Sequence, residues 1–440
     1  MNRLRKLKMN SLLYPPSNRL GLSIWTVVAA FGSYFCMYGF RKPFTAAGYE
    51  EFTLMGLSYK SVLVTSQVLG YMLSKFIGIR VISEMPPAVR GRTILVLIGI
   101  AQSALLFFAL VPVPWNFICL FVNGLPLGMV FGLVLGFLEG RRATEVLAAG
   151  LCASFILADG VTKSVGSYLL IAGVNEFWMP FGAGAVFAFP LLVFVGMLSQ
   201  VPSPTQNDEL HRSRRAPMSR EDRRLLFLKY ATGMTLLVGA YLLLTILRSV
   251  RADFAPEIWK GLGHAAPPSL FARSEIYVMF GVVLINGMAV FIINNRRAFF
   301  AAMAASVTGF CLVGLALVGL NNTWFDGFQF MVVIGLGLYL PYVAVHTTIF
   351  ERLIAMTGEK GNIGFLMYLA DSFGYLGYVV VMLARGGSKS NAGFLDFFIA
   401  LSWIGAGIAF ILLAGGWFYF AARTRPGQPG KIIRGEGVAV

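Results

Sequence analysis

Two arginines, each seven residues after a tyrosine, are the residues of this chain best placed for chemistry inside a membrane. Tyr34 precedes Arg41 near the end of the first long apolar segment, and Tyr241 precedes Arg248 near the end of a matching segment in the second half. Seven residues make two helical turns, so each tyrosine shares a helix face with its arginine. A charge at the bilayer centre costs about 2.5–3.5 kcal/mol on insertion scales. Its repetition predicts a duplicated membrane protein with a central anion site.

A lysine and a tyrosine extend this pattern into the second apolar segment, where Tyr71 and Lys75 lie four residues apart on one helix face. Lys75 could extend its ammonium group to water near a membrane surface, since Arg80 follows it. The alternative, which we favour, is a lysine that faces the central cavity. Guanidinium binds phosphate and carboxylate oxygens through paired hydrogen bonds, and tyrosine adds neutral donors. The predicted substrate-binding residues are Arg41, Arg248, Lys75, Tyr34, Tyr38, Tyr71 and Tyr241.

Two carboxylates inside apolar segments are candidates for coupling transport to a proton. Asp159 is followed four residues later by Lys163, a spacing that favours an ion pair within one helix but leaves a titrating carboxylate open. Asp371 has no basic residue within a turn, so it is the better candidate for a lone intramembrane carboxylate, unless it pairs across the bundle. We expect His346 to be a core histidine rather than a ligand.

Other polar and small residues have simpler interpretations. Five glycines spaced by four form one bare helical stripe that predicts close helix packing, which could also slide during transport: Gly124, Gly128, Gly132, Gly136 and Gly140. Charged residues flank the longest outer loop, and we expect most of them to be solvated: Arg251, Asp253, Glu257, Lys260 and Arg273.

The composition requires a lipid environment. The chain has 440 residues, of which 57% are hydrophobic and only 13% charged, whereas soluble domains carry about 25% charged residues. The formal net charge of +16 would suggest nucleic acid for a soluble protein. Here the charges lie in short loops, so they predict membrane orientation and no nucleic-acid partner.

Signatures of enzymes and metal sites are absent from the sequence. The four cysteines fall inside apolar segments, and the three histidines are scattered, so we expect no metal and no disulfide framework. No phosphate-binding glycine loop or nucleophile elbow occurs. We therefore expect no cofactor, no ATP-driven pump and no enzyme. The long first apolar segment, without a cleavage site, predicts that no signal peptide is removed.

Apolar segments long enough to cross a ~30 Å hydrocarbon core recur along the chain. They predict an all-α integral membrane protein of twelve transmembrane helices. The segments lie near 21–43, 60–79, 93–113, 115–138, 146–172, 177–199, 227–248, 273–294, 297–320, 326–350, 362–384 and 395–421.

Loop charges predict the orientation of these spans. Most of the 36 Lys and Arg residues fall in loops on the side of the N-terminus, which predicts cytoplasmic termini and a plasma (inner) membrane location. A charged linker separates six spans from six, the plan of the major facilitator superfamily. The predicted parts are a tail at 1–20, a bundle at 21–199, a linker at 200–226, a bundle at 227–421 and a tail at 422–440. We expect a monomer.

Several runs resemble the organophosphate:phosphate antiporters, the glycerol-3-phosphate and hexose-6-phosphate transporters. These are YFCMYGFRKPFTAA (34–47), YMLSKF (71–76), LRSVRADFAPEIW (247–259), GLGLYLPYVAVH (335–346) and SFGYLGY (372–378). The resemblance implies a major facilitator fold of two pseudo-symmetric bundles. It also implies a phosphate-type anion held between Arg41 and Arg248, with Lys75 and the tyrosines beside it, at a site that alternates between the two membrane sides.

Two departures from that family affect the expected mechanism. Asp159 and Gly160 stand where the family has a histidine beside an asparagine, and an acid there would weaken phosphate binding or bring in a proton. The loop IGIRVISEMPPAVRGR (77–92) keeps Arg90, Gly91 and Arg92 but has only the displaced Glu84 as its acid. The main hypothesis is secondary transport of a small organic anion. The alternatives are proton-coupled transport of another solute through Asp159 or Asp371, and a sensor or scaffold that does not transport.

Overall fold

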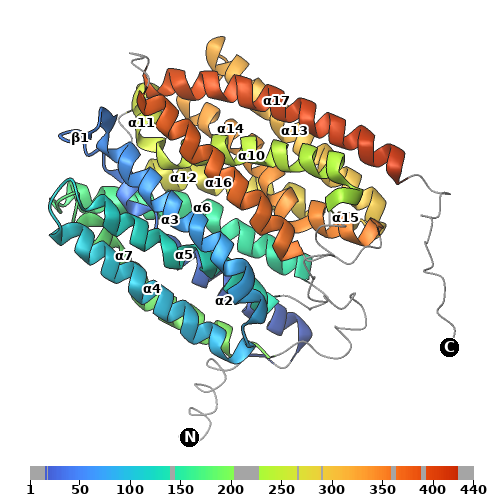
Figure 1. Ribbon diagram of the computed structural model, residues 1–440, viewed down its shortest axis with the longest axis horizontal. Coiled ribbons are helices and arrows are strands. Elements are labelled where there is room, and N and C mark those ends of the chain that lie inside the picture. Colours follow the sequence, from blue (N-terminus) through green and yellow to red (C-terminus); the bar gives the residue numbers. More distant parts are fainter. Residues whose placement is uncertain are drawn as a thin grey trace, which may run out of the picture.

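The computed structural model describes residues 15–16, 18–138, 144–202, 227–264, 267–288, 291–357, 363–387 and 393–424, and these are mostly helical (Figure 1). Most of the predicted linker, most of both predicted tails and Gly140 of the glycine stripe lie outside the described residues.

The first half contains six long helices and one small hairpin. The helices are α2 (Arg19–Tyr38), α3 (Tyr59–Glu84), α4 (Pro87–Leu110), α5 (Phe117–Leu138), α6 (Thr144–Ile171) and α7 (Met179–Ser199). Between α2 and α3 lie the short helix η1 (Pro43–Ala46) and the antiparallel strands β1 (Thr53–Leu54) and β2 (Leu57–Ser58). Met55 and Gly56 connect the strands with positive φ angles of 53° and 78°, as a tight hairpin turn requires.

The second half repeats the arrangement. Its long helices are α10 (Ala231–Asp253), α12 (Ser269–Met288), α13 (Asn295–Asn321), α14 (Gly327–Ala344), α16 (Ile363–Gly387) and α17 (Phe394–Arg423). The short α11 (Ala255–Gly261) follows α10, and α14 continues through the π-helical turn η3 (Val345–Ile349) into α15 (Phe350–Thr357).

Eleven helices of the described chain are long and apolar enough to cross a membrane. The remaining long helix, α3, has 26 residues that include Lys60, Lys75, Arg80 and Glu84. Lys60 and Lys75 are buried, and α3 packs between α5 and α16. The charges of Lys60 and Lys75 are therefore covered by protein, as membrane proteins require.

The described helices form two bundles that meet along two seams (Figure 1). Within the first half α2 packs on α6 and α7, and α5 packs on α3 and α4. Within the second half α10 packs on α16 and α17, and α14 packs on α12 and α13. Helix α6 meets α12, and α3 meets α16, across the halves. We call the end with the β1–β2 hairpin and α11 the loop face, and the opposite end, where α2 begins and α17 ends, the terminal face.

The predicted first span is too long. Helix α2 ends at Tyr38, and Arg41 lies in the turn that follows, because Gly39 begins the turn and Pro43 starts η1. Arg248 in contrast lies inside α10. The two Tyr–Arg pairs therefore differ in local structure although their spacing is the same.

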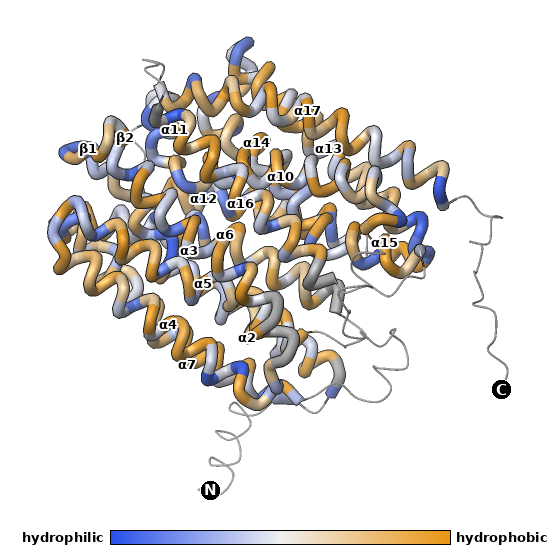
Figure 2. The backbone as a smooth tube through the Cα atoms, in the orientation of Figure 1, coloured by the Kyte–Doolittle hydropathy of each residue, from blue (hydrophilic) through white to orange (hydrophobic). Residues whose placement is uncertain are grey.

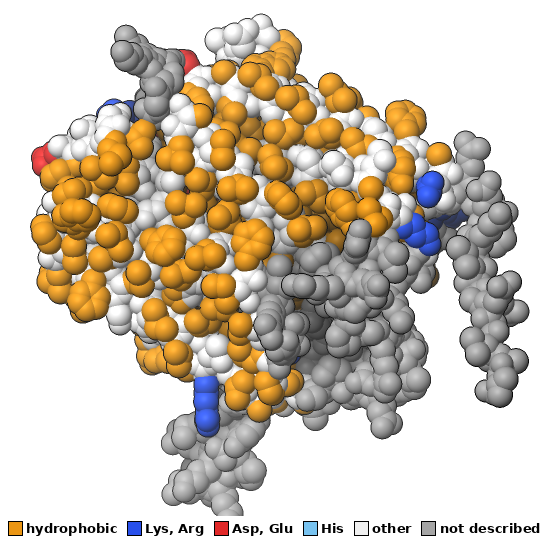
Figure 3. All heavy atoms as spheres, viewed as in Figure 1, with side chains coloured by type: hydrophobic (Ala, Val, Ile, Leu, Met, Phe, Trp, Pro, Cys, Tyr) orange, Lys and Arg blue, Asp and Glu red, His pale blue; other side chains and the backbone are white. Residues whose placement is uncertain are grey.

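Figure 2 shows hydrophobic residues along most of the length of the helices, and the face in Figure 3 is largely covered by hydrophobic side chains, with Lys and Arg near its edges. Large apolar side chains of the helices are exposed, among them Phe189 of α7 at 75%, Phe418 of α17 at 72% and Leu284 of α12 at 68%. Such a surface fits the lipid environment that the composition predicts.

The glycine stripe of α5 explains how α3 is held. A Cβ atom added at Gly124 would stand 2.1 Å from the carbonyl oxygen of Gln67 in α3. A glycine of α3 meets the backbone of α5 equally closely: a Cβ atom added at Gly70 would stand 2.1 Å from the carbonyl oxygen of Phe121 in α5. The two backbones therefore touch, the close approach that small residues permit in membranes.

We expect Gly124→Val to destabilise the protein by about 1–3 kcal/mol, because α3 must move away from α5. The measurement is the midpoint of thermal unfolding of the detergent-purified protein. The control is Gly99→Val, since an added Cβ at Gly99 meets nothing within 4 Å. Equal midpoints for the two variants would contradict the packing role.

Candidate functional site

Arg41 is positioned by a hydrogen-bonded turn rather than by a helix. Gln67 donates to the Arg41 carbonyl at 3.0 Å and to the Asn123 side chain at 2.7 Å, and Asn123 donates to the Phe40 carbonyl at 3.1 Å. This network ties the turn to α3 and α5. The Arg41 guanidinium lies over the Tyr71 ring, with its Cζ 3.8 Å from the ring centroid, a favourable cation–π contact.

Arg248 reaches the same region from the second half. Its Cζ lies 4.3 Å from the centroid of the Tyr342 ring, and its Nη2 donates to the Tyr375 hydroxyl at 3.3 Å. Tyr375 packs edge-on against Tyr71 at 5.1 Å, and its ring centroid lies 5.9 Å from the Cζ of Arg41. The two arginines therefore contact one tyrosine from opposite halves of the protein.

The charges of Arg41 and Arg248 are not compensated. Both side chains are buried, with 3% and 5% exposure, and neither Nε has a hydrogen-bond partner. No carboxylate of the described residues forms an ion pair with either one. The other buried cations are paired: Lys42 with Asp253, Lys60 with Glu257, Lys75 with Asp371, Lys163 with Asp159 and Arg251 with Glu275. Within the described chain, the interior therefore holds two positive charges in excess.

The predicted tyrosines take different places around the arginines. Tyr38 lies 5.7 Å from the Arg41 Cζ, ring centroid to carbon, and packs on Tyr34 at 5.6 Å. Tyr34 lies one turn before Tyr38 in α2, and its ring centroid is 5.3 Å from that of Phe131. Tyr241 donates to Asp371 and stacks on Tyr342 at 5.6 Å. Tyr38 and Tyr71 are therefore near the arginines, whereas Tyr34 and Tyr241 line the region next to them.

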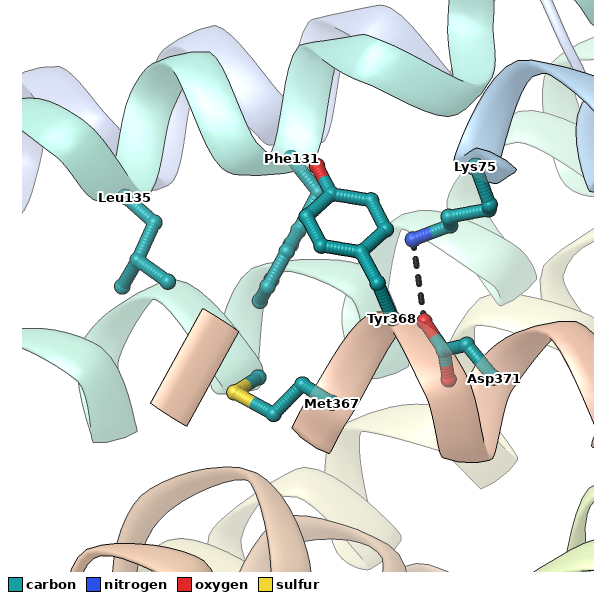
Figure 4. Close-up of a pocket in the computed structure, with 6 residues that line it drawn as sticks. All are labelled: Lys75, Phe131, Leu135, Met367, Tyr368 and Asp371. Atoms are coloured by element: carbon teal, nitrogen blue, oxygen red, sulfur yellow. Dashed lines mark ion pairs between the residues drawn. The ribbon is translucent and has the colours of Figure 1, made fainter. Parts of the chain in front are cut away.

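Asp371 is not a lone carboxylate. Lys75 of α3 lies 2.9 Å from its Oδ2, so the pair joins the two halves (Figure 4). The prediction from local spacing missed this partner, because it is almost three hundred positions away in the chain. Lys75 lines a small pocket, but its ammonium group is held by Asp371 and lies 4.9 Å from the Tyr368 ring centroid.

His346 belongs to the same cluster. Its Nε2 lies 3.8 Å from Asp371 Oδ1, and its Nδ1 is 2.9 Å from the Tyr342 carbonyl oxygen. A small pocket next to the Lys75–Asp371 pair is otherwise lined by Phe131, Leu135, Met367 and Tyr368 (Figure 4). The pair therefore forms part of the wall of this pocket.

Asp159 and Lys163 form the ion pair that their spacing favours, with Nζ 2.5 Å from Oδ2. Lys42 is also near, with its Nζ 3.9 Å from Asp159 Oδ1, although its closer partner is Asp253 of the second half. Asp253 also accepts a hydrogen bond from Tyr378 at 3.0 Å.

The expected solvation of the outer charged residues is wrong for Arg251 and Asp253, which are both buried. Arg251 pairs with Glu275 at 2.8 Å and donates to the Met331 carbonyl. Lys260 is exposed as expected and reaches Glu50 at 3.3 Å. The sequence analysis also did not identify Tyr375 and Tyr342; their only signal is their place in the runs 372–378 and 335–346. No group of three metal-ligating side chains occurs in the described parts of the chain.

Comparison with known proteins supports the fold and names a family. A crystal structure of the nucleoside transporter NupG matches with a TM-score of 0.57 at 14% identity, over 91% of this chain and 100% of that one. This likeness shows the fold, and it confirms the predicted all-α, multi-pass architecture of two six-helix bundles, the major facilitator fold. No curated protein sequence matches this chain. A family model described as a family of unknown function, DUF5690, matches residues 43–423, and the chain therefore belongs to that family.

Proposed function

We propose that this protein is a secondary transporter for a small organic anion with two negative charges, bound between Arg41 and Arg248. The observation that carries the proposal is the pair of buried guanidinium groups without a carboxylate partner where the halves meet. Uncompensated charge is unfavourable in a low-dielectric interior. A dianion would supply the missing charge, and the neighbouring tyrosine hydroxyls would donate to its remaining oxygens.

Phosphate monoesters and dicarboxylates are the substrate classes that fit. A phosphate monoester carries a charge of about −1.5 to −2 near neutral pH and offers three acceptor oxygens. Arginine binds such groups through its planar fork of donors. The resemblance to organophosphate antiporters favours the phosphate esters. A nucleoside, the solute named for NupG, is neutral and would leave both arginines uncompensated.

The ion pairs between the halves suggest how such a site could alternate. Lys42–Asp253 and Lys60–Glu257 join the halves near the loop face, and Lys75–Asp371 joins them on the other side of the arginines. When the halves rock, the two ion pairs near the loop face would break while Lys75–Asp371 stays intact, or the opposite would occur. The arginines would then face one membrane side at a time.

The alternatives make different demands on the site. A sensor or scaffold would have no need of two unpaired cations in its interior. A proton carrier at Asp371 was predicted on the premise of an unpaired carboxylate, and Lys75 now pairs with it. We further propose an inner-membrane location with both termini in the cytoplasm, supported by the loop charges, and a function without catalysis.

The proposal is tested by counterflow in proteoliposomes that contain the purified full chain. We expect glycerol phosphate and succinate to exchange in a saturable way and to compete with each other. Acetate and uridine should not compete, because they supply one negative charge or none. Each exchange is measured with and without a pH gradient. Uridine uptake that is indifferent to every dianion would reject the proposal.

A further inference from the structure

Asp159 has a carboxylate oxygen that the resting structure leaves unused. Its Oδ2 binds Lys163, but its Oδ1 is buried and without a hydrogen-bond partner. A buried carboxylate oxygen without a hydrogen-bond partner is unfavourable, so such atoms call for an explanation. The nearest cation beyond Lys163 is Lys42, whose Nζ is 3.9 Å away.

Lys42 stands between two carboxylates that belong to different halves. Its present partner, Asp253, ends α10 in the second half, whereas Asp159 lies in α6 of the same half as Lys42. All three side chains are buried. If the halves separate at the loop face, Lys42 must leave Asp253, and Asp159 is the acid that moves with it.

The other partners of these pairs also stay within their own halves. Asp253 keeps the hydrogen bond from Tyr378 of α16. Lys60 keeps its 2.7 Å hydrogen bond to the Thr45 carbonyl when it leaves Glu257, which is partly exposed. Asp253 and Lys60 therefore each retain a polar partner after separation. For Lys42, Asp159 is the only other carboxylate among the described residues that lies within 4.0 Å.

We propose that Asp159 is the alternative partner of Lys42, and that transfer of Lys42 from Asp253 to Asp159 allows the loop face to open. This inference rests on the proposed alternation of the two halves. Lys163 restrains the transfer, because its positive charge beside Asp159 weakens the attraction of the carboxylate for a second cation. Asp159 thus acts as a positioning residue for the gate and does not bind the substrate.

The two charges on α6 should therefore act in opposite directions. We define the open fraction as the fraction of molecules in which the halves are separated at the loop face. Asp159→Asn removes the alternative partner and should lower the open fraction about tenfold, which corresponds to about 1.4 kcal/mol in the free energy of opening. Lys163→Gln frees Asp159 for Lys42 and should raise the open fraction by a similar factor. The double variant should match Asp159→Asn, since Lys163 acts only through Asp159.

The open fraction is measured by double electron–electron resonance, which gives the distribution of distances between two spin labels. The labels are attached to cysteines at positions 55 and 260 in a nanodisc-embedded chain whose native cysteines are replaced. Met55 is 93% exposed in the first half, and the Lys260 side chain is 79% exposed in the second. Arg273→Gln, which removes an exposed charge near the same face, is the control and should leave the distances unchanged.

Opposite shifts in the two single variants support the gate, and loss of packing alone would not produce them. A rise of the open fraction in Asp159→Asn, or no rise in Lys163→Gln, overturns the inference. The measurement needs no substrate. Shifts as expected, in a protein that exchanges no dianion, would keep the gate and reject the proposed substrate class. Dianion exchange without these shifts would keep the proposed substrate class and reject the gate.

Discussion

Replacing either Arg41 or Arg248 with lysine is expected to lower dianion exchange about 10- to 100-fold. Lysine keeps the charge but loses the planar fork that binds two oxygens at once, and charge-assisted hydrogen bonds contribute about 1.5–3 kcal/mol each. Lysine also stacks less well on Tyr71 and Tyr342, which now hold the two guanidinium groups in place. The initial rate of counterflow in proteoliposomes measures the effect.

Replacing one of the two arginines with glutamine should change selectivity as well as rate. With Arg248→Gln the excess interior charge falls from two to one, so a monoanion would compensate it fully. We expect exchange of succinate or a phosphate ester to fall, and exchange of lactate, a monoanion that the parent site excludes, to appear. Arg273→Gln, at an exposed position of α12, is the matched control and should leave both rates as they are in the parent protein. Loss of dianion exchange without any gain of lactate exchange would contradict the charge argument.

The fold could be predicted because the signals for it are local. Long apolar runs and the charge of the loops between them are properties of consecutive residues, and they gave the helices now seen in the structure. The end of α2 was missed although its signals, Gly39 and Pro43, are local too. The apolar run continues past Tyr38 through Gly39 and Phe40, so hydropathy alone extends the helix past its true end.

The site could be predicted only in part, because ion pairs between distant residues leave no local pattern. The cost of burying charge singled out Arg41, Arg248 and Lys75, and all three are buried. It did not indicate that Lys75 is neutralised by Asp371 or that Asp253 is buried against Lys42. Spacing rules find only partners within a helical turn or two, as for Asp159 and Lys163.

The Lys75–Asp371 pair should be strongly coupled in stability. Removing one partner leaves the other charge buried and unpaired, so Lys75→Gln or Asp371→Asn alone is expected to destabilise the protein by about 3–5 kcal/mol. Removing both charges leaves neutral amides that can hydrogen-bond to each other. The double variant should therefore be close to the parent protein, and the double-mutant cycle should give a large interaction energy.

Denaturation of the purified protein, followed for the parent and the three variants under identical detergent conditions, measures this cycle. The Lys60–Glu257 pair supplies the comparison, because Glu257 is partly exposed and Lys60 also binds the Thr45 carbonyl. Its cycle should give a smaller interaction energy, since water can solvate the released carboxylate. Additive effects at Lys75 and Asp371 would mean that the two charges are solvated independently. The halves would then be held together near the terminal face by apolar packing of α3 on α16 and not by this ion pair.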